Sequence, residues 1–311
     1  MTSRMEEGLP IVASIYLNFI IWGILARAKE QFDIKVCHFI FLFNHMHLLL
    51  VVRNPEHVEK FQGFIKAEIT HAINHILGYR KKSRWDKGAD TPIVLDKEKA
   101  INQIVYIYSN PQRANLVDSI DEYPGVSSWK MFVSGVHKKT CKKVHRPQIK
   151  PIQGGELSVN EGRRLAEELD RCIKEEKEFV LEPFAWLEGY EDLSEKEKAE
   201  IKEEIISRVR DREEEFRKER VANKRTVIGS TALRRQSMCK DYYPKSFGKR
   251  MICLGTQKED RIAFISMYRN LCGLARKAYE QWVAGHLRVQ LPAGMIPPRM
   301  LVLAGTMVSL L

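Results

Sequence analysis

The first half of the chain alternates between apolar runs and amphipathic segments. Residues 11–26 are almost wholly apolar, which predicts a buried helix that reaches about Gln31. Residues 35–43 are rich in β-branched and aromatic side chains and predict a strand. Residues 45–52 predict the returning strand of a hairpin, with Asn44 in the turn.

Two amphipathic helices complete this half. Residues 57–77 place apolar side chains at helical spacing, so one face of this helix is expected to pack on a core. A second helix is predicted to begin after Asp96, which suits an N-cap, and to end at Asn110 because Pro111 follows. The apolar stripe of this second helix consists of Ile101, Ile104, Val105 and Tyr108.

The second half is more polar and its pattern is weaker. Residues 151–222 predict an acidic helical segment, with a capping-box signature at Ser194 and Glu197. A basic loop is expected over residues 138–150, and the proline, glycine and charge content around residues 145–156 indicates a boundary. We therefore expect segments 1–150, 151–222 and 223–311, the last mainly helical with its strongest helix near 259–284.

Charge is distributed in blocks along the 311 residues, whose formal net charge is +11. The segments 1–150 and 223–311 carry balances of +8 and +11, and the segment between them carries −8. Basic blocks raise the local concentration of polyanions, so nucleic acid or an anionic surface is the first partner to consider.

The cysteines and the apolar run bear on location. Six scattered cysteines without a C-x-x-C pair argue against a zinc ribbon or a disulfide framework and favour the reducing cytoplasm. Residues 11–26 fall short of the roughly 20 residues that span a bilayer, with no basic leader before them. We expect no membrane insertion, and a membrane-associated protein held by this run remains a less favoured hypothesis.

Two histidines on the second predicted strand are candidates for chemistry. Residues two apart on a strand share a face, so His45 and His47 project together while Met46 points into apolar packing. Two neighbouring imidazoles form either half of a divalent metal site or a hydrogen-bonded pair. Their spacing leaves both interpretations open.

The second helix presents a further pair of polar side chains. Tyr106 lies away from the apolar stripe, and Asn110 follows one turn later on the same face, whereas Tyr108 belongs to the stripe. By itself this face is equally well described as plain surface.

Three short motifs give the sequence a family resemblance. They are Phe43-Asn-His-Met-His-Leu-Leu-Leu50, Tyr106-Ile-Tyr-Ser-Asn-Pro-Gln-Arg-Ala114 and Tyr123-Pro-Gly-Val-Ser-Ser-Trp129. In order and spacing, over about 130 residues, they resemble the REP-associated branch of the single-tyrosine HUH transposases. HUH denotes histidine, a hydrophobic residue and histidine, and Met46 supplies the middle position.

The resemblance implies an α/β (α+β) fold with a ferredoxin-like antiparallel sheet and helices on one face. It also implies that His45, His47 and Asn110 bind Mg²⁺ or Mn²⁺ and that Tyr106 is the nucleophile. The implied reaction cleaves and rejoins single-stranded or hairpin DNA through a 5′-phosphotyrosine link.

A basic loop before the tyrosine helix is the predicted DNA contact. It combines phosphate-pairing cations with a stacking ring, and Arg113 beyond the helix is a further phosphate ligand. The loop residues concerned are Arg80, Lys81, Lys82, Arg84 and Trp85. A solvated surface loop is the alternative, and a homodimer remains open because members of the family act as monomers or dimers.

The chain departs from the family pattern at two places. Residues 1–4 stand where the end of a first strand is expected, which predicts an exposed sheet edge and places activity in doubt. Phe43 replaces the usual proline before Asn44. The alternative function is therefore a truncated or domesticated relative that binds nucleic acid without cutting it.

Overall fold

The computed structural model describes residues 1–5, 15–86, 88–144, 160, 163–164, 167–168, 171, 173–190, 193–236, 250–286, 288–292, 295, 300–303 and 306–309. The predicted boundary at 145–156, the start of the first helix before residue 15, and Cys172 and Cys239 lie outside these residues. The four cysteines within them are unpaired.

A three-stranded antiparallel sheet lies at the centre, with strand order β1-β3-β2. The hairpin of β2 (Ile34–Phe41) and β3 (His45–Val52) matches the prediction closely. The short strand β1 (Thr2–Arg4) pairs with β3 so that Thr2 lies opposite His47 and Arg4 lies opposite His45. The residues at the start of the chain therefore do form a strand.

The outer edge of β1 is covered rather than exposed, which corrects the prediction. Residues 85–86 and 88–90 run along it, with the Thr2 amide donating to the Asp90 carbonyl at 2.7 Å and the Asp90 amide donating back at 2.9 Å. The order β1, α1, β2, β3, α2 and this extended segment follows the β-α-β-β-α-β plan of ferredoxin-like folds.

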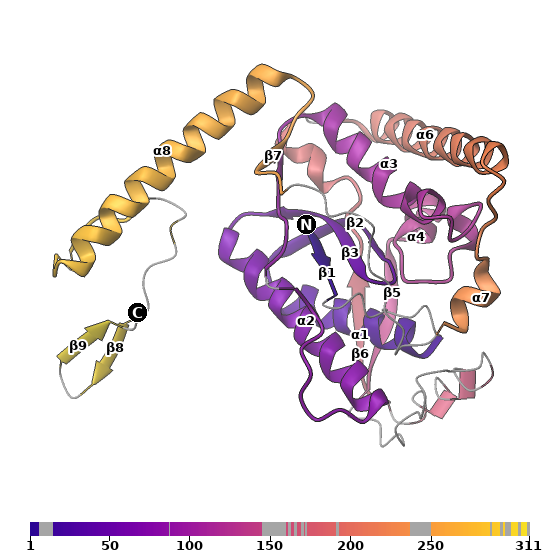
Figure 1. Cartoon of the computed structure of the whole chain (residues 1–311), viewed down its shortest axis with the longest axis horizontal. Coiled ribbons are helices and arrows are strands. Elements are labelled where there is room, and N and C mark those ends of the chain that lie inside the picture. Colours follow the sequence, from indigo (N-terminus) through magenta and orange to yellow (C-terminus); the bar gives the residue numbers. More distant parts are fainter. Residues whose placement is uncertain are drawn as a thin grey trace.

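Two helices cover one face of the sheet (Figure 1). They are α1 (Ile15–Gln31) and α2 (Pro55–Leu77), which begins at an Asn54 cap and ends at Gly78 in the left-handed conformation, φ 73°. Their apolar side chains pack with Phe39, Met46 and Leu48 of the sheet in one continuous core.

The opposite face is covered as well, chiefly by α3 (Lys97–Arg113). Its predicted apolar stripe is buried against Ile40 and Leu42. The short helices α4 (Trp129–Ser134), η2 (Ile120–Glu122) and η4 (Ala185–Gly189) and the long α6 (Glu195–Ala222) contribute to the same core. Helices thus lie on both faces, whereas the prediction placed them on one.

The end of α3 differs from the prediction. The helix starts as expected, with the Asp96 side chain accepting from the Lys99 amide at 2.7 Å, but it runs past Asn110 and Pro111 to Arg113. Proline removes only one backbone N–H donor from the helix. The turn around Pro111 is buried, and the Ala114 amide donates to the Asn110 carbonyl at 3.0 Å.

A strand pair replaces the expected helix and loop in the middle of the chain. The basic loop predicted over residues 138–150 contains β5 (Lys138–Val144). The acidic segment contains β6 (Ile173–Val180), the antiparallel partner of β5. Lysines of β5 face glutamates of β6, as in the Lys138–Glu178 ion pair at 3.2 Å. Gly23 of α1 lies so close to β5 that a Cβ there would come within 2.5 Å of the Lys142 carbonyl oxygen.

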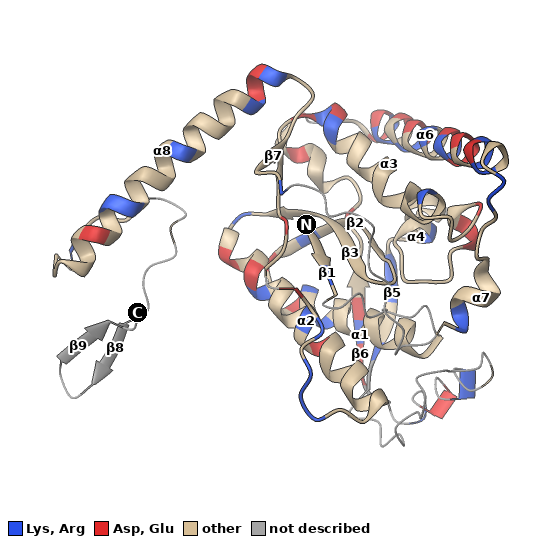
Figure 2. Ribbon diagram, in the orientation of Figure 1, with Lys and Arg blue, Asp and Glu red and all other residues tan. Residues whose placement is uncertain are grey.

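The remaining elements lie towards the C-terminus. The predicted long helix is α6, whose capping box at Ser194 and Glu197 is present and whose surface mixes both signs of charge (Figure 2). The short α7 (Ser230–Arg234) follows, then β7 (Cys253–Leu254), which pairs in parallel with β4 (Ile93–Val94). The exposed α8 (Lys258–Val283) projects from the rest, and β8 (Met300–Leu303) pairs with β9 (Thr306–Ser309) (Figure 1).

The predicted fold class is confirmed: an antiparallel sheet with helices, followed by a mainly helical second half. Within the described ranges, no helix is both long enough and apolar enough to cross a membrane.

A buried polar network ties the sheet to α3. The His38 ring of β2 donates from Nε2 to the Pro183 carbonyl at 3.0 Å, and its Nδ1 accepts from the Tyr108 hydroxyl at 2.7 Å. The Tyr108 oxygen lies 2.9 Å from Ser128 Oγ. Burial lowers the pKa of His38 from 6.5 to about 3, so the ring is neutral in the folded protein.

A second buried group fixes the C-terminal end of α3 to α6. The Glu213 carboxylate is 4 % exposed and accepts from the Gln112 side chain at 2.8 Å and the Ile120 amide at 2.7 Å. Its other oxygen accepts from Arg210 at 2.8 Å. Arg220, also on α6, donates to the Gln112 carbonyl at 3.1 Å. The end of α3 therefore depends on α6.

His38 is expected to make folding stability depend on acidity. Below pH 6.5 the unfolded chain protonates this residue while the folded chain does not until about pH 3, so stability is lost as the pH falls through that window. The free energy of unfolding, measured by denaturant titration at several pH values, should depend on pH less steeply in His38→Gln. The slope of this free energy against pH should be smaller by up to about 1.4 kcal/mol per pH unit. The exposed His71 on α2 is the control, and His71→Gln should leave the slope unchanged.

Loss of Glu213 is expected to destabilise the fold. Glu213→Ala leaves several buried donors without their charged acceptor and should lower the free energy of unfolding by about 1.5–3 kcal/mol. Its neighbour Glu214 makes only surface ion pairs with Arg217 and Lys218, so Glu214→Ala should cost less than about 1 kcal/mol. Equal effects of the two variants in denaturant titrations would contradict the assigned role.

Candidate functional site

The two histidines of β3 lie side by side on the face that α3 covers. Their ring centroids are 4.8 Å apart and their planes are nearly perpendicular, at 88°. Met46 between them is fully buried in the core of the opposite face, together with Leu48. The alternation predicted from the sequence is therefore present, and His47 is itself 8 % exposed.

The helix α3 brings Tyr106 and Asn110 to these histidines. The Tyr106 ring lies 5.4 Å from the His47 ring, edge to face at 77°. The Asn110 side-chain amide donates to His47 Nε2 at 3.1 Å. Four residues from two regions of the sequence thus form one cluster, which we call the His–Tyr–Asn cluster: His45, His47, Tyr106 and Asn110.

Neighbouring side chains orient both imidazoles. The ring nitrogen Nδ1 of His45 lies 2.6 Å from Asn44 Oδ1, and Nδ1 of His47 lies 2.8 Å from Thr2 Oγ1. Because Asn44 Oδ1 can only accept, His45 carries its proton on Nδ1 and leaves Nε2 with a lone pair. The same proton position at His47 leaves its Nε2 to accept from Asn110.

Both imidazoles are held neutral. Burial, assisted by the charge of Arg4, lowers the pKa of His45 from 6.5 to about 4. Burial also takes the pKa of His47 well below its usual value, with a smaller contribution from His45. A neutral imidazole offers a lone pair to a cation, whereas a protonated one repels it.

The cluster fits a divalent cation as a set of nitrogen and oxygen donors. The two Nε2 lone pairs would be ligands, and Asn110 would contribute its amide oxygen after turning its side chain. No group of three or more histidine, cysteine, aspartate or glutamate side chains suited to a metal occurs in the described part of the chain. The candidate donor set is therefore neutral, which leaves the charge of a cation available to an anionic ligand.

Arg113 extends the cluster towards solvent. Its guanidinium carbon lies 5.6 Å from the centroid of the Tyr106 ring, and the side chain is exposed. A guanidinium group over a phenol ring is held there by cation–π attraction and can also bind a phosphate.

The predicted basic loop is only partly available to a ligand. Arg84 is 1 % exposed and donates to the Asn74 side chain at 2.7 Å, and Trp85 is 7 % exposed with its indole donating to the Lys66 carbonyl. Both side chains are covered in this structure, Arg84 by contacts with α2 and the residues just after it and Trp85 by the core, so the predicted DNA contact of these two residues would need a rearrangement of the loop. Arg80 and Lys81 are exposed, and Lys82 is half-buried with its amine 5.6 Å from the Tyr79 ring centroid.

Three residues of the site escaped the sequence reasoning. Thr2 and Asn44 fix the histidine rings, and Arg4 lies opposite His45 across the sheet. Asn44 precedes the first histidine and gave a local signal. Thr2 and Arg4 gave none, since only the pairing of β1 with β3 brings them near.

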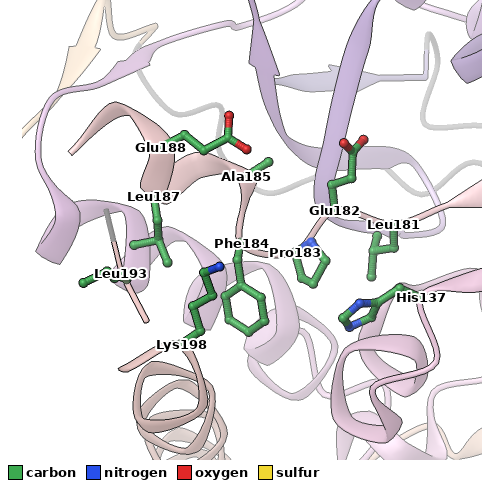
Figure 3. Close-up of a pocket in the computed structure, with 10 residues that line it drawn as sticks. All are labelled: His137, Leu181, Glu182, Pro183, Phe184, Ala185, Leu187, Glu188, Leu193 and Lys198. Carbon is green, nitrogen blue, oxygen red and sulfur yellow. The ribbon is translucent and has the colours of Figure 1, made fainter. Parts of the chain in front are cut away.

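A separate pocket of about 300 Å³ lies beside η4 and contains none of the predicted site residues (Figure 3). Apolar side chains such as Phe184 and Leu187 form much of its wall. Its two carboxylates are already paired, Glu182 with Lys29 and Glu188 with Lys35. It offers no constellation comparable to the His–Tyr–Asn cluster.

Comparison with known proteins adds a distant likeness. No protein-family model and no curated protein matches the sequence. Among solved structures, the chain is similar to a REP-associated tyrosine transposase bound to a REP hairpin, with a TM-score of 0.34 and 18% sequence identity. The match covers 43% of this chain and 76% of the other. A likeness this weak carries no argument about activity, which is argued below from the chain's own residues.

Proposed function

We propose that the protein is a metal-dependent tyrosine transposase that cleaves and rejoins single-stranded or hairpin DNA. The observation that supports the proposal is the contact between Tyr106 and His47, with ring centroids 5.4 Å apart, in a cluster whose members come from separate motifs. The sequence motifs point to the same four residues. Plain surface residues have no reason to converge in this way.

The chemistry follows from the side chains. Tyr106 attacks the scissile phosphorus, a tyrosine–phosphate bond forms, and the bond to the 3′ oxygen breaks. The phenol loses a proton and the departing 3′ oxygen gains one, so the energy of the phosphodiester is kept for rejoining. Arg113, whose guanidinium carbon lies 5.6 Å from the centroid of the Tyr106 ring, offers a positively charged group to the phosphate.

A divalent cation bound by His45, His47 and Asn110 would neutralise the charge that develops on the phosphate. Asn44 and Thr2 hold the two rings in the orientation that such binding needs. Exposed Arg80 and Lys81 are proposed to contact the DNA backbone at a greater distance from the cluster.

Replacement of Tyr106 by phenylalanine is expected to abolish a covalent protein–DNA adduct. The protein is incubated with labelled hairpin DNA that carries single-stranded flanks, in Mn²⁺, and the adduct is resolved by denaturing electrophoresis. Tyr108→Phe removes a hydroxyl two residues away in the same helix and should retain the adduct, whereas chelation of the metal should remove it. Adduct formation by Tyr106→Phe would refute the assigned nucleophile.

A protein that binds DNA in a salt-dependent manner but gives no adduct under any metal condition would favour the alternative, a relative that binds without cutting.

Metal binding is expected to depend on the cluster and is measurable without DNA. Titration with Mn²⁺, followed by electron paramagnetic resonance of the free ion, should show binding to the wild type and none to His47→Ala. Asn110→Asp replaces a neutral oxygen donor with a charged one and should bind Mn²⁺ more tightly. The control His71→Ala, on the exposed side of α2, should match the wild type. Equal binding by His47→Ala would place the metal elsewhere.

A further inference from the structure

A second pocket lies directly beyond the tyrosine, where the C-terminal ends of α3 and α6 meet. Its volume is about 220 Å³. Arginine and asparagine side chains dominate its wall: it is lined by Arg113, Asn115, Phe216, Glu219, Arg220, Asn223 and Arg225. Four of these, Phe216, Glu219, Arg220 and Asn223, come from α6 or its cap, a region outside the family resemblance.

The charges in this pocket suit an anion. Arg220 is buried and paired with Asp118 at 2.5 Å, whereas Arg113 and Arg225 have no ion-pair partner among the described residues. Because Asp118 offsets the charge of Arg220, two guanidinium groups, those of Arg113 and Arg225, remain against Glu219, the one carboxylate among the lining residues. Guanidinium groups match a phosphate in geometry as well as in charge.

The pocket wall is held by the fold and needs no ligand to form. The amides of Ile228 and Gly229 donate to the carbonyls of Asn115 and Leu116 at 3.0 and 2.9 Å, which fixes the segment that carries Arg225. Asn115 and Lys224 both adopt the left-handed conformation, at φ 55° and 51°. These two turns direct the chain back from the ends of α3 and α6.

Arg113 connects this pocket to the His–Tyr–Asn cluster. The same guanidinium lies 5.6 Å from the Tyr106 ring and lines the pocket. A DNA strand whose scissile phosphate is at Tyr106 therefore has a basic, concave surface one side chain away. The aromatic ring of Phe216 in the wall adds a surface on which a base or sugar can pack.

We propose that the pocket between α3 and α6 binds a backbone phosphate of the single-stranded DNA next to the bond that Tyr106 cleaves. This inference rests on the proposed function and assigns a DNA contact to the C-terminal half. Arg225 is the residue that tests it, because it is exposed, lies outside the cluster and takes part in no described ion pair.

The test measures binding in the absence of metal, so that no cleavage is needed. Affinity for a fluorescent hairpin with single-stranded flanks is measured over a range of salt for wild type, Arg225→Gln and Arg276→Gln. The control Arg276 is exposed on α8 and removes the same charge away from the pocket. Loss of one phosphate contact should reduce the slope of log affinity against log salt by about 0.7 for Arg225→Gln, with the control unchanged.

Equal slopes for Arg225→Gln and Arg276→Gln would overturn the inference. A thermal shift of the wild type by inorganic phosphate that is lost in Arg225→Gln, without a change in the DNA slope, would also overturn it and indicate a free-anion site. Failure of the proposed function is a separate result. If the wild type forms no Tyr106 adduct, the proposed cleavage reaction is refuted, but the comparison of salt slopes still shows whether the pocket binds a DNA phosphate.

Discussion

The alternation of side chains along β3 is the constraint on which the site depends. Both faces of the sheet are buried, so Met46 and Leu48 must point to the core under α1 and α2, and His45 and His47 must point to α3. A shift of one residue in the pairing of β3 would place the histidines in an apolar core. The register with β1 and β2 prevents that shift and also brings Thr2 and Arg4 to the histidine pair.

Burial under α3 gives the histidines their chemical character. The helix that delivers Tyr106 and Asn110 also removes water from the imidazoles, and this loss of water lowers their pKa values. Positively charged Arg4 acts in the same direction. The result is a pair of neutral nitrogen donors, with the positive charge of Arg4 close to His45 and that of Arg113 over the Tyr106 ring.

Local patterns in the sequence were sufficient for the elements that position the cluster. The hairpin, the start of α3 at Asp96 and its buried stripe follow from periodicity and capping, and the sequence motifs selected His45, His47, Tyr106 and Asn110. The roles of these four residues stay predictions, but their proximity is a property of the structure.

What the sequence did not predict depends on contacts between distant segments. The sequence pattern predicts a helix at β6 and a loop at β5. Each of these strands pairs with a segment that is distant in the sequence, so neither leaves a local signal. The composition of residues 80–85 predicts an exposed DNA-binding loop. Arg84 and Trp85 are nevertheless covered by tertiary packing.

Contacts between distant segments also connect the acidic segment to the site. The acidic segment is not a separate solvated unit, because β6 pairs with basic β5, Arg208 of α6 bonds to Glu98 of α3 at 2.7 Å, and Glu213 holds the far end of α3. Opposite charge thus joins the acidic segment to the first half at several points. Since Glu213 and Arg220 bond to Gln112, two residues from Asn110, the position of the His–Tyr–Asn cluster depends on residues a hundred positions further along the chain. The helix that carries Tyr106 is thus held in place by residues that lie beyond the first 150.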